Sequence, residues 1–260
     1  MRVALLQYPI EWADIETNLN LTGRRLAAIS GKAEVALLPE MFTTGFCTDR
    51  PELAEDMQGT TLQHLYSWAE QYNIAIAGSF IAADKDGIYN RGFFVKPDKT
   101  ADFIDKKHLY AHGGENDFFT PGTERKIVEY LGCRFCLLIC YDLRFPVWSR
   151  NRSGYDYDIL LYCANWPDIR IKYWDALLLA RATENQCYVA AVNRVGDDRL
   201  NLHYNGHSIA LDTRLQPLVQ FEDNEANTKI ADFDMEALRH FRERSPLWKD
   251  ADPFVFINNL

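Results

Sequence analysis

The segment Leu137–Pro146, LLICYDLRFP, joins an apolar run to a cysteine, an Asp-x-Arg triplet and a proline. The apolar part predicts a buried strand ending at Cys140, and Pro146 predicts the start of a helix or a turn. A cysteine inside a strand is ordinarily a buried structural thiol. At a strand-to-helix junction, however, a cysteine can face a cleft beside free backbone N–H groups, an arrangement that favours acyl transfer.

Short apolar runs like this one recur along the chain, and several are apolar at every position, as expected of strands covered on both faces. They lie at residues 3–8, 34–40, 74–82, 91–95, 133–141, 158–166, 187–193, 207–211 and 217–221. Helical periodicity occurs at 61–72 and 171–185, and Asp234 is placed to cap a third helix. Strands that separate helices predict α/β layers, and the turns at Asp98-Lys99 and Asp212-Thr213 predict antiparallel pairs.

The composition restricts the possible partners. The 260 residues suffice for a large hydrophobic core, and a net charge of -9 disfavours nucleic acid and anionic membranes as partners. The first residues lack the pattern of a signal peptide, and no apolar run approaches the roughly 18 residues of a membrane span. The six cysteines lie mostly in apolar runs, which is typical of reduced thiols. We therefore expect a cytoplasmic protein with one domain over residues 1–260, in which 246–260 form a tail that drapes over the body or reaches a partner chain.

Cys133, Cys136 and Cys140 form a C-x2-C-x3-C pattern that must be tested for metal binding. Side chains alternate along a strand, so Cys136 and Cys140 face one way and Cys133 faces the other. Structural zinc sites favour repeated C-x2-C pairs on turns, and the sequence has no second pair. A redox disulfide is equally disfavoured, because residues four apart in a strand lie about 13 Å apart. The sequence predicts no metal.

Two further apolar runs end in residues that suit a nucleophilic thiol. Glu40 closes one run beside Leu38, Met41 and Phe42, where its charged form would be disfavoured. Such a carboxyl is suited to accept a thiol proton at neutral pH. In FIDKKHLY a pair of lysines, 106 and 107, follows another expected strand. Each feature alone is also typical of a solvated strand end.

Taken in this order, LLPEMFTTGF, DKKHLY and CYDLRFPVWSR resemble the signature of the nitrilase superfamily of carbon–nitrogen hydrolases. Matching the motifs implies a catalytic triad of Glu40, Lys106 and Cys140, with Lys107 as a neighbour. Glu115, in GENDFFTPG, stands where the superfamily has a second glutamate. ANWP, RATENQCYVAAVNRVG and YNGHS extend the resemblance over essentially the whole chain. The resemblance implies an α/β fold in which four layers form an αββα sandwich.

Within the superfamily, CYDLRFPVWSRN, ANWP and RATENQ are most similar to the bacterial omega-amidase branch. That branch hydrolyses the terminal amide of 2-oxoglutaramate and related ω-amides of 2-oxo dicarboxylates. The resemblance implies a thioester on Cys140 and proton transfer by Glu40. It also implies that Lys106 and the backbone N–H of Tyr141 stabilise the oxyanion, that Glu115 orients Lys106, that no cofactor is used and that the protein is a homodimer.

The distal carboxylate of such a substrate requires a cation that can form two parallel hydrogen bonds with its two oxygens. Arg170 is the candidate, because it lies a few residues beyond ANWP. Arg144 could also serve, but we expect it to hold the cysteine turn by pairing with Asp142 or Glu184. The aromatic and imidazole side chains expected to line the cleft are Phe46, Tyr141, Trp166 and His207.

Other functions are compatible with the same residues. An amidase of this superfamily could act on another acid amide, an N-carbamoyl compound or a nitrile, because only the distal pocket discriminates among them. From other classes, a catalytically silent binding module and a thiol redox sensor are the alternatives. The joint presence of all four catalytic residue types argues against a silent protein.

Overall fold

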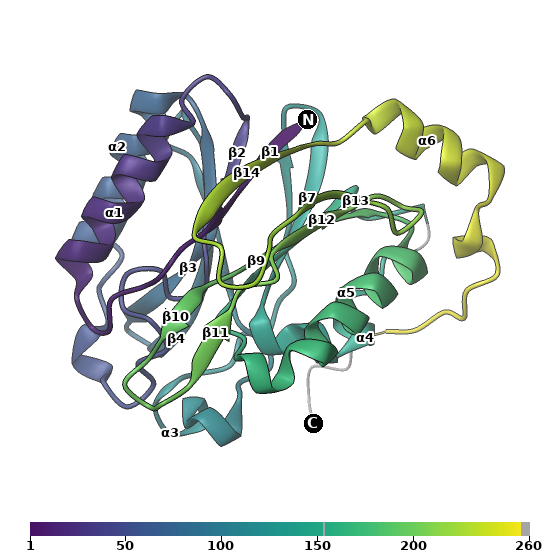
Figure 1. The fold of residues 1–260 in the computed structure, drawn as a ribbon. Coiled ribbons are helices and arrows are strands. Elements are labelled where there is room, and N and C mark those ends of the chain that lie inside the picture. The colour runs from purple at the N-terminus through teal and green to yellow at the C-terminus, as the bar shows by residue number, and fades with distance from the viewer. Residues whose placement is uncertain (153, 256–260) are drawn as a thin grey trace.

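Two six-stranded sheets lie face to face at the centre of the protein (Figure 1). The computed structural model describes residues 1–152 and 154–255 of the chain. The strand order is β14-β1-β2-β3-β4-β5 in the first sheet and β13-β12-β9-β8-β7-β6 in the second, and β10 and β11 form a separate pair. In each sheet three parallel strands, β1 to β3 or β7 to β9, are flanked by antiparallel ones.

The strands of the first sheet are β1 Arg2–Gln7, β2 Val35–Leu37, β3 Ala75–Asp84, β4 Gly87–Val95, β5 Ala101–Asp105 and β14 Asn227–Asp232. Those of the second are β6 Ile127–Tyr130, β7 Cys133–Ile139, β8 Ile159–Ala164, β9 Tyr188–Asn193, β12 Ile209–Leu211 and β13 Pro217–Gln220. The separate pair consists of β10 Val195–Asp197 and β11 His203–Asn205.

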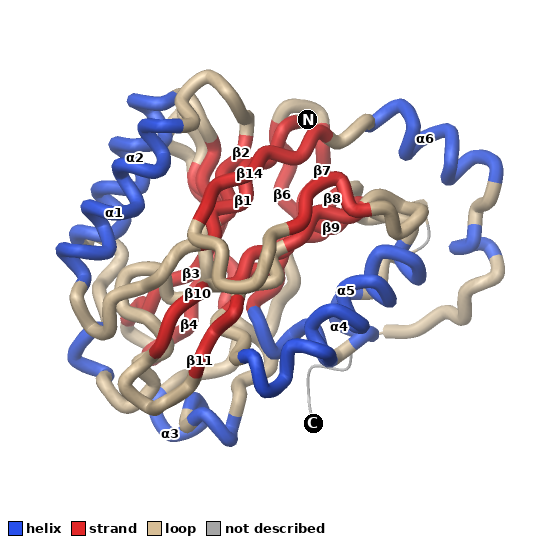
Figure 2. Tube along the Cα trace, viewed as in Figure 1, coloured by secondary structure: helices blue, strands red, loops and turns tan. Residues whose placement is uncertain are grey.

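Helices cover the outer face of each sheet, so that the layers follow the order αββα (Figure 2). α1 and α2 pack on the first sheet, and α5 packs on the second (Figure 1). The helices are α1 Ile15–Ala28, α2 Thr60–Tyr72, α3 Glu115–Phe118, α4 Pro146–Ser149, α5 Ile171–Asn185 and α6 Met235–Arg244. This arrangement confirms the predicted four-layer fold. Among the described residues, no helix combines the length and the apolar character of a membrane span.

The two faces of β1 show why the predicted strands are apolar at successive positions. Val3 and Leu5 pack in the core that includes the opposite sheet, whereas Ala4 and Leu6 pack against α1 and α2. After the exposed Arg2, both faces of the strand are therefore buried, and every position from 3 to 7 is inaccessible to solvent. Each of the nine predicted apolar runs overlaps a strand of the structure.

The helix α1 was not predicted from the sequence. Asp14 caps this helix by accepting a hydrogen bond from the backbone N–H of Thr17 at 3.0 Å. Its buried face contains Asn18 and Thr22 as well as leucines, so the apolar stripe is interrupted. The helices at 61–72 and 171–185, and the cap at Asp234, are confirmed.

Part of the predicted tail can be followed. After α6 the chain forms a single 3₁₀ turn, Leu247–Lys249, and the backbone N–H of Leu247 donates to Gln186 Oε1 at 3.2 Å. This segment therefore lies against the body of the protein. The last part of the predicted tail, residues 256–260, lies outside the described residues.

Candidate active site

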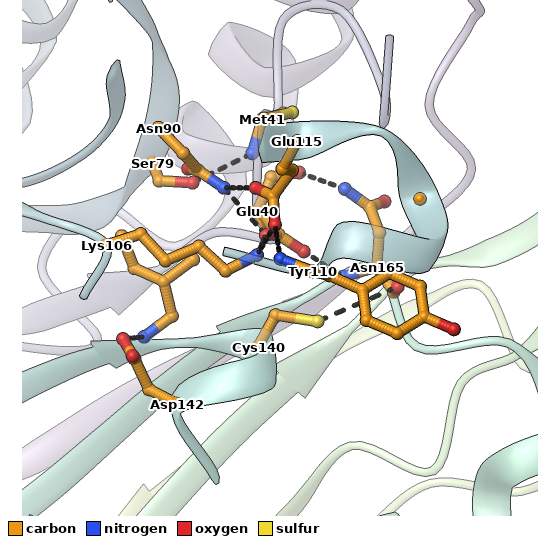
Figure 3. A network of polar contacts seen from close by, with 12 residues as sticks. Glu40, Met41, Ser79, Asn90, Lys106, Tyr110, Glu115, Cys140, Asp142 and Asn165 are labelled. Carbon is orange, nitrogen blue, oxygen red and sulfur yellow. Dashed lines mark hydrogen bonds and ion pairs between the residues drawn. The ribbon is translucent and has the colours of Figure 1, made fainter. Parts of the chain in front are cut away.

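Glu40, Lys106 and Cys140 follow three different strands and meet at one end of the sheets. Glu40 lies shortly after β2, Lys106 directly follows β5, and Cys140 directly follows β7. β2 and β5 belong to the first sheet and β7 to the second, so the three residues approach one another from both sheets. Figure 3 shows their side chains gathered in one space between the strand ends.

Lys106 is the centre of a buried polar network. Its Nζ donates to Glu40 Oε1 at 2.9 Å and to Glu115 Oε2 at 2.7 Å, and none of these three side chains has any exposed surface. Asn90, on β4, donates from its Nδ2 to Glu40 at 2.8 Å and to Glu115 at 3.1 Å. Two buried carboxylates thus share one cation and one amide group.

Glu115 enters this network from a turn that ends at Gly114. The φ of Gly114 is 77°, a left-handed conformation that glycine adopts without steric cost. Glu115 then begins α3, and its Oε2 also accepts a hydrogen bond from the backbone N–H of Tyr110 at 2.6 Å. The local backbone therefore fixes the carboxylate, and the carboxylate in turn orients Lys106.

Gly122 fixes the backbone on which Lys106 is carried. Its N–H donates to the carbonyl of Lys106 at 2.8 Å. A Cβ atom at Gly122 would lie 2.1 Å from the carbonyl oxygen of Asp105, far inside van der Waals contact. Only glycine permits this close approach of the two chain segments.

Cys140 occupies a strained position where β7 turns into the 3₁₀ segment Cys140–Arg144. Its φ is 45°, which is uncommon for a residue with a side chain and persists only where neighbouring groups hold it. Asp142 provides such support, because its two carboxylate oxygens accept the backbone N–H groups of Ile139 at 3.1 Å and His108 at 3.0 Å. One carboxylate thus ties the cysteine turn to the segment that follows β5.

The prediction that Arg144 pairs with Asp142 or Glu184 is wrong. Asp142 is paired with His108 Nδ1 at 2.8 Å, and Glu184 with Arg181 at 2.8 Å. Within the described residues Arg144 forms no salt bridge. Both carboxylates are therefore paired with other residues, His108 and Arg181.

Burial and neighbouring charges decide which groups in the network carry protons. Burial raises the pKa of the Cys140 thiol well above its usual range; Glu40 adds to this effect and Lys106 opposes it. Burial alone would lower the pKa of Lys106, but the charges of Glu115 and Glu40 raise it well above its usual range. Burial also raises the pKa of Glu115. At neutral pH the thiol is therefore protonated and the lysine charged, so a base must take the proton before the sulfur can act as a nucleophile.

Asn165, immediately after β8, links the thiol to Glu40. The Cys140 thiol donates to the carbonyl of Asn165 at 3.8 Å. The backbone N–H of Asn165 donates to Glu40 Oε2 at 2.8 Å, and its Nδ2 donates to the carbonyl of Glu40 at 2.8 Å. Asn165 was not predicted as a site residue, although it belongs to the ANWP motif at the end of a predicted strand. Asn90 was not predicted either, because the sequence offers no local signal for it.

A cavity of about 310 Å³ opens over Cys140. Of the predicted cleft residues, Phe46, Tyr141, Trp166 and Arg170 lie in its wall. The hairpin of β10 and β11 contributes further wall residues that were not predicted from the sequence, namely Leu200, Leu202 and Tyr204.

Two arginines bring positive charge to this cavity. The guanidinium of Arg144 lies 4.6 Å from the ring centre of Tyr173 and 5.4 Å from that of Trp166, and the guanidinium of Arg170 lies 5.3 Å from that of Tyr110. Aromatic faces attract a cation without neutralising it. The N–H groups of both side chains therefore remain suited to a negatively charged ligand.

His207 does not line the cavity, so that prediction is wrong. Its φ is 61°, and its ring lies between two carboxylates outside the cavity wall. Nδ1 is 3.0 Å from Asp175 on α5, and Nε2 is 2.6 Å from Asp223 in the segment between β13 and β14. The carboxylates draw the imidazole toward the surface, where it ties these two segments together.

The cysteines are free and buried at all six positions. Among the described residues no group of three or more histidine, cysteine, aspartate or glutamate side chains is arranged to hold a metal ion. Of the six thiols, Cys140 is the one found in the wall of the cavity over the charged network.

Comparisons with known proteins agree with this geometry. The omega-amidase YafV of Escherichia coli (strain K12) is 43% identical over 256 residues, covering 98% of each chain. The 2-oxoglutaramate amidase of Bacillus subtilis (strain 168) is 30% identical and covers 95% of this chain and 96% of its own. A crystal structure of a CN-hydrolase superfamily protein from Xanthomonas campestris, with an arsenic adduct in the active site, has a TM-score of 0.96 and 38% identity over 98% of each chain.

The family model of carbon-nitrogen hydrolases matches residues 2–243, nearly the whole chain. The full-length similarity to two amidases and the two-sheet fold agree with that match. The protein therefore belongs to the carbon-nitrogen hydrolase family and is a hydrolase of non-peptide carbon–nitrogen bonds.

Proposed function

We propose that this protein is an omega-amidase that hydrolyses the terminal amide of 2-oxoglutaramate and similar ω-amides of 2-oxo dicarboxylates. The observation that carries the proposal is the position of Cys140. This residue lies between the buried Glu40–Lys106–Glu115 network and a cavity that is lined by two arginines. The network suits amide hydrolysis, and the arginines suit a substrate with a carboxylate at its far end. The names of the two amidase relatives point to the same substrate class.

In the first step the sulfur of Cys140 attacks the amide carbonyl, and Glu40 takes the thiol proton. The negative oxygen of the tetrahedral intermediate is held by the Lys106 ammonium and the backbone N–H of Tyr141. Glu40 then returns the proton to the nitrogen as the C–N bond breaks, because an amide anion cannot leave unprotonated. Ammonia departs, and the acyl group remains on Cys140 as a thioester.

In the second step water attacks the thioester. Glu40 removes a proton from this water, the same donors hold the second tetrahedral oxygen, and the C–S bond breaks. The proton passes to the sulfur, so the thiol is regenerated and the carboxylic acid is released. Glu115 holds the Lys106 ammonium in place throughout. This sequence of steps uses no cofactor.

At the far end of the cavity we assign recognition of the 2-oxo acid carboxylate to Arg170, with Arg144 as a second contributor. Both guanidinium groups lie against aromatic rings, and neither forms a salt bridge within the described part of the chain. Phe46 and Trp166 contribute aromatic rings to the wall of the same cavity.

We expect Arg170→Ala to raise KM for 2-oxoglutaramate about tenfold or more, because a hydrogen bond to a charged group contributes about 1.5 to 3 kcal/mol. Arg144→Ala should act in the same direction. The measurement is steady-state ammonia release from 2-oxoglutaramate and from an uncharged amide of similar length. Arg199→Ala, on the same hairpin as Leu200 but not in the cavity wall, is the control. An unchanged preference between the charged and uncharged amides would remove Arg170 from this role.

The substrate itself is tested by ammonia release from 2-oxoglutaramate, 2-oxosuccinamate, glutamine, N-carbamoyl amino acids and simple nitriles. We expect the two 2-oxo acid amides to give the highest kcat/KM. A higher value for nitriles or N-carbamoyl compounds would reject the omega-amidase assignment and favour another activity of the same family.

We also propose that the protein works in the cytoplasm as a homodimer. Exposed apolar side chains on α4 and α5 support a subunit contact: Val147 is 53% exposed and Tyr173 55% exposed. The mass in solution, measured by light scattering, distinguishes a dimer from the 30.0 kDa monomer.

A further inference from the structure

The peptide unit between Asn165 and Trp166 connects the thiol to a residue outside the cavity wall. On one side its carbonyl accepts the hydrogen bond of the Cys140 thiol at 3.8 Å. On the other side its N–H, that of Trp166, donates to the side-chain oxygen of Asn193 at 2.8 Å. A peptide unit is planar and rigid, so the group that fixes its N–H also fixes the direction of its carbonyl.

Asn193 ends β9, is fully buried, and is held in a single orientation. Its Oδ1 accepts from the backbone N–H groups of Trp166 and Arg194, at 2.8 and 3.0 Å. Its Nδ2 donates to the carbonyls of Trp166 and Gly206, both at 2.8 Å. A rotated amide would set its nitrogen against two N–H donors and its oxygen against two carbonyls, so this network admits one orientation.

The backbone of Asn193 is itself supported from the neighbouring strand segment. Its N–H donates to Ser208 Oγ at 2.9 Å, and the Ser208 hydroxyl donates to the Asn193 carbonyl at 3.3 Å. The Asn193 side chain therefore forms hydrogen bonds with both the N–H and the carbonyl of Trp166, and the Asn193 backbone is itself held in place by Ser208. The adjacent residue, Asn165, is the one that holds Glu40 through two hydrogen bonds of 2.8 Å.

We propose that Asn193 is a positioning residue for amide hydrolysis, which holds the Asn165–Trp166 peptide so that Cys140 and Glu40 keep their reacting arrangement. The inference rests on the proposed roles of Cys140 and Glu40. In the described structure Asn193 makes no hydrogen bond to either of them, and it acts through the peptide. A displacement of about 1 Å at reacting groups can reduce turnover by about 100-fold. Loss of the hydrogen bonds from the Asn193 side chain to Trp166 should therefore lower kcat.

The test compares Asn193→Ala with Asn185→Ala. Asn185 is also a buried asparagine, it accepts from the backbone N–H of Asn151 at 2.7 Å and donates to the carbonyl of Arg181 at 3.0 Å, and it is not in the cavity wall. Both variants lose a buried amide that bridges backbone groups, so a purely structural loss should affect them alike. We expect Asn193→Ala to lower kcat for 2-oxoglutaramate about 100-fold with KM changed less than threefold, and Asn185→Ala to keep kcat within threefold.

A second readout is independent of the substrate assignment. The rate at which iodoacetamide alkylates Cys140, followed by mass spectrometry of the cysteine peptide across pH, reports how readily the thiol loses its proton. We expect Asn193→Ala to slow this reaction at least tenfold and Asn185→Ala to leave it unchanged. If the wild type fails to hydrolyse 2-oxoglutaramate but the alkylation rates differ in this way, the proposed substrate falls and the positioning role stands.

A further variant, Ser208→Ala, is used in case Asn193→Ala does not fold. It removes the hydrogen bonds between Ser208 and the Asn193 backbone but keeps the Asn193 side chain, and the buried Ser149→Ala is its control. We expect kcat to fall about tenfold in Ser208→Ala, because Asn193 is then held less firmly, and to stay unchanged in Ser149→Ala. Equal kcat and equal alkylation rates in folded Asn193→Ala and Asn185→Ala would overturn the proposal. If Asn193→Ala cannot be folded, a Ser208→Ala variant indistinguishable from Ser149→Ala would overturn it.

Discussion

Cys140→Ala is expected to lower ammonia release by at least about 10⁴-fold, because no thioester can form without the sulfur. The pKa of this thiol is raised by burial and by Glu40, so its proton has to leave with the help of a neighbouring base. Alanine removes only the sulfur and leaves the network of Glu40, Lys106 and Glu115 in place. The measurement is ammonia release from 2-oxoglutaramate under saturating conditions.

Cys136→Ala is the matched control for this experiment. Cys136 lies on β7, four positions before Cys140, and is fully buried in the core. The Cys136→Ala variant should retain most of the wild-type turnover, because the side chain of Cys136 is not in the cavity wall. Circular dichroism of both variants checks that they fold. Similar losses of turnover in the two folded variants would contradict the special role given to Cys140.

The fold was predictable to the extent that burial leaves a regular pattern in the sequence. Strands covered on both faces appear as continuous apolar runs, so those of the two sheet centres were predicted. α1 was missed because its buried face includes Asn18 and Thr22. β14 was missed because most of its residues are only partly buried or exposed, so that NTKIAD lacks an apolar run. Both segments owe their structure to contacts that a local pattern does not encode.

The candidate site was predictable only through motifs whose members lie far apart in the chain. Spacing along the sequence cannot indicate that Glu40 and Cys140 meet, because this depends on how the two sheets pack. The predicted ion-pair partners of Arg144 and the predicted place of His207 in the cavity wall were wrong for the same reason, because residues on other segments decide where these side chains point. Asn193 stood in a motif that carries the resemblance, yet its hydrogen bonds to a neighbouring strand end became evident only in three dimensions.

The second large effect is expected for Lys106→Met. Loss of one donor to the tetrahedral oxygen costs about 3 to 4 kcal/mol of barrier, so kcat should fall by about 10² to 10³. Removing Lys106 also leaves Glu40 and Glu115 without their shared cation inside the protein. Breaking a buried ion pair by removal of one partner destabilises a protein by about 3 to 5 kcal/mol. We therefore expect this variant to lose both turnover and stability, in contrast to Cys140→Ala.

The stability loss should depend on pH in a defined direction. Burial already raises the pKa of Glu115, and the variant lacks the cation that opposes this shift. A carboxyl whose pKa is higher in the folded state favours folding while it is protonated, and this contribution is lost as pH rises through the folded-state pKa. The free energy of unfolding of Lys106→Met should therefore decrease between acid and neutral pH more than that of the wild type. Urea unfolding of both proteins across this range, with Lys107→Met as the control, measures the difference. A variant as stable as Lys107→Met, with the same pH dependence, would show that the two carboxylates do not rely on Lys106.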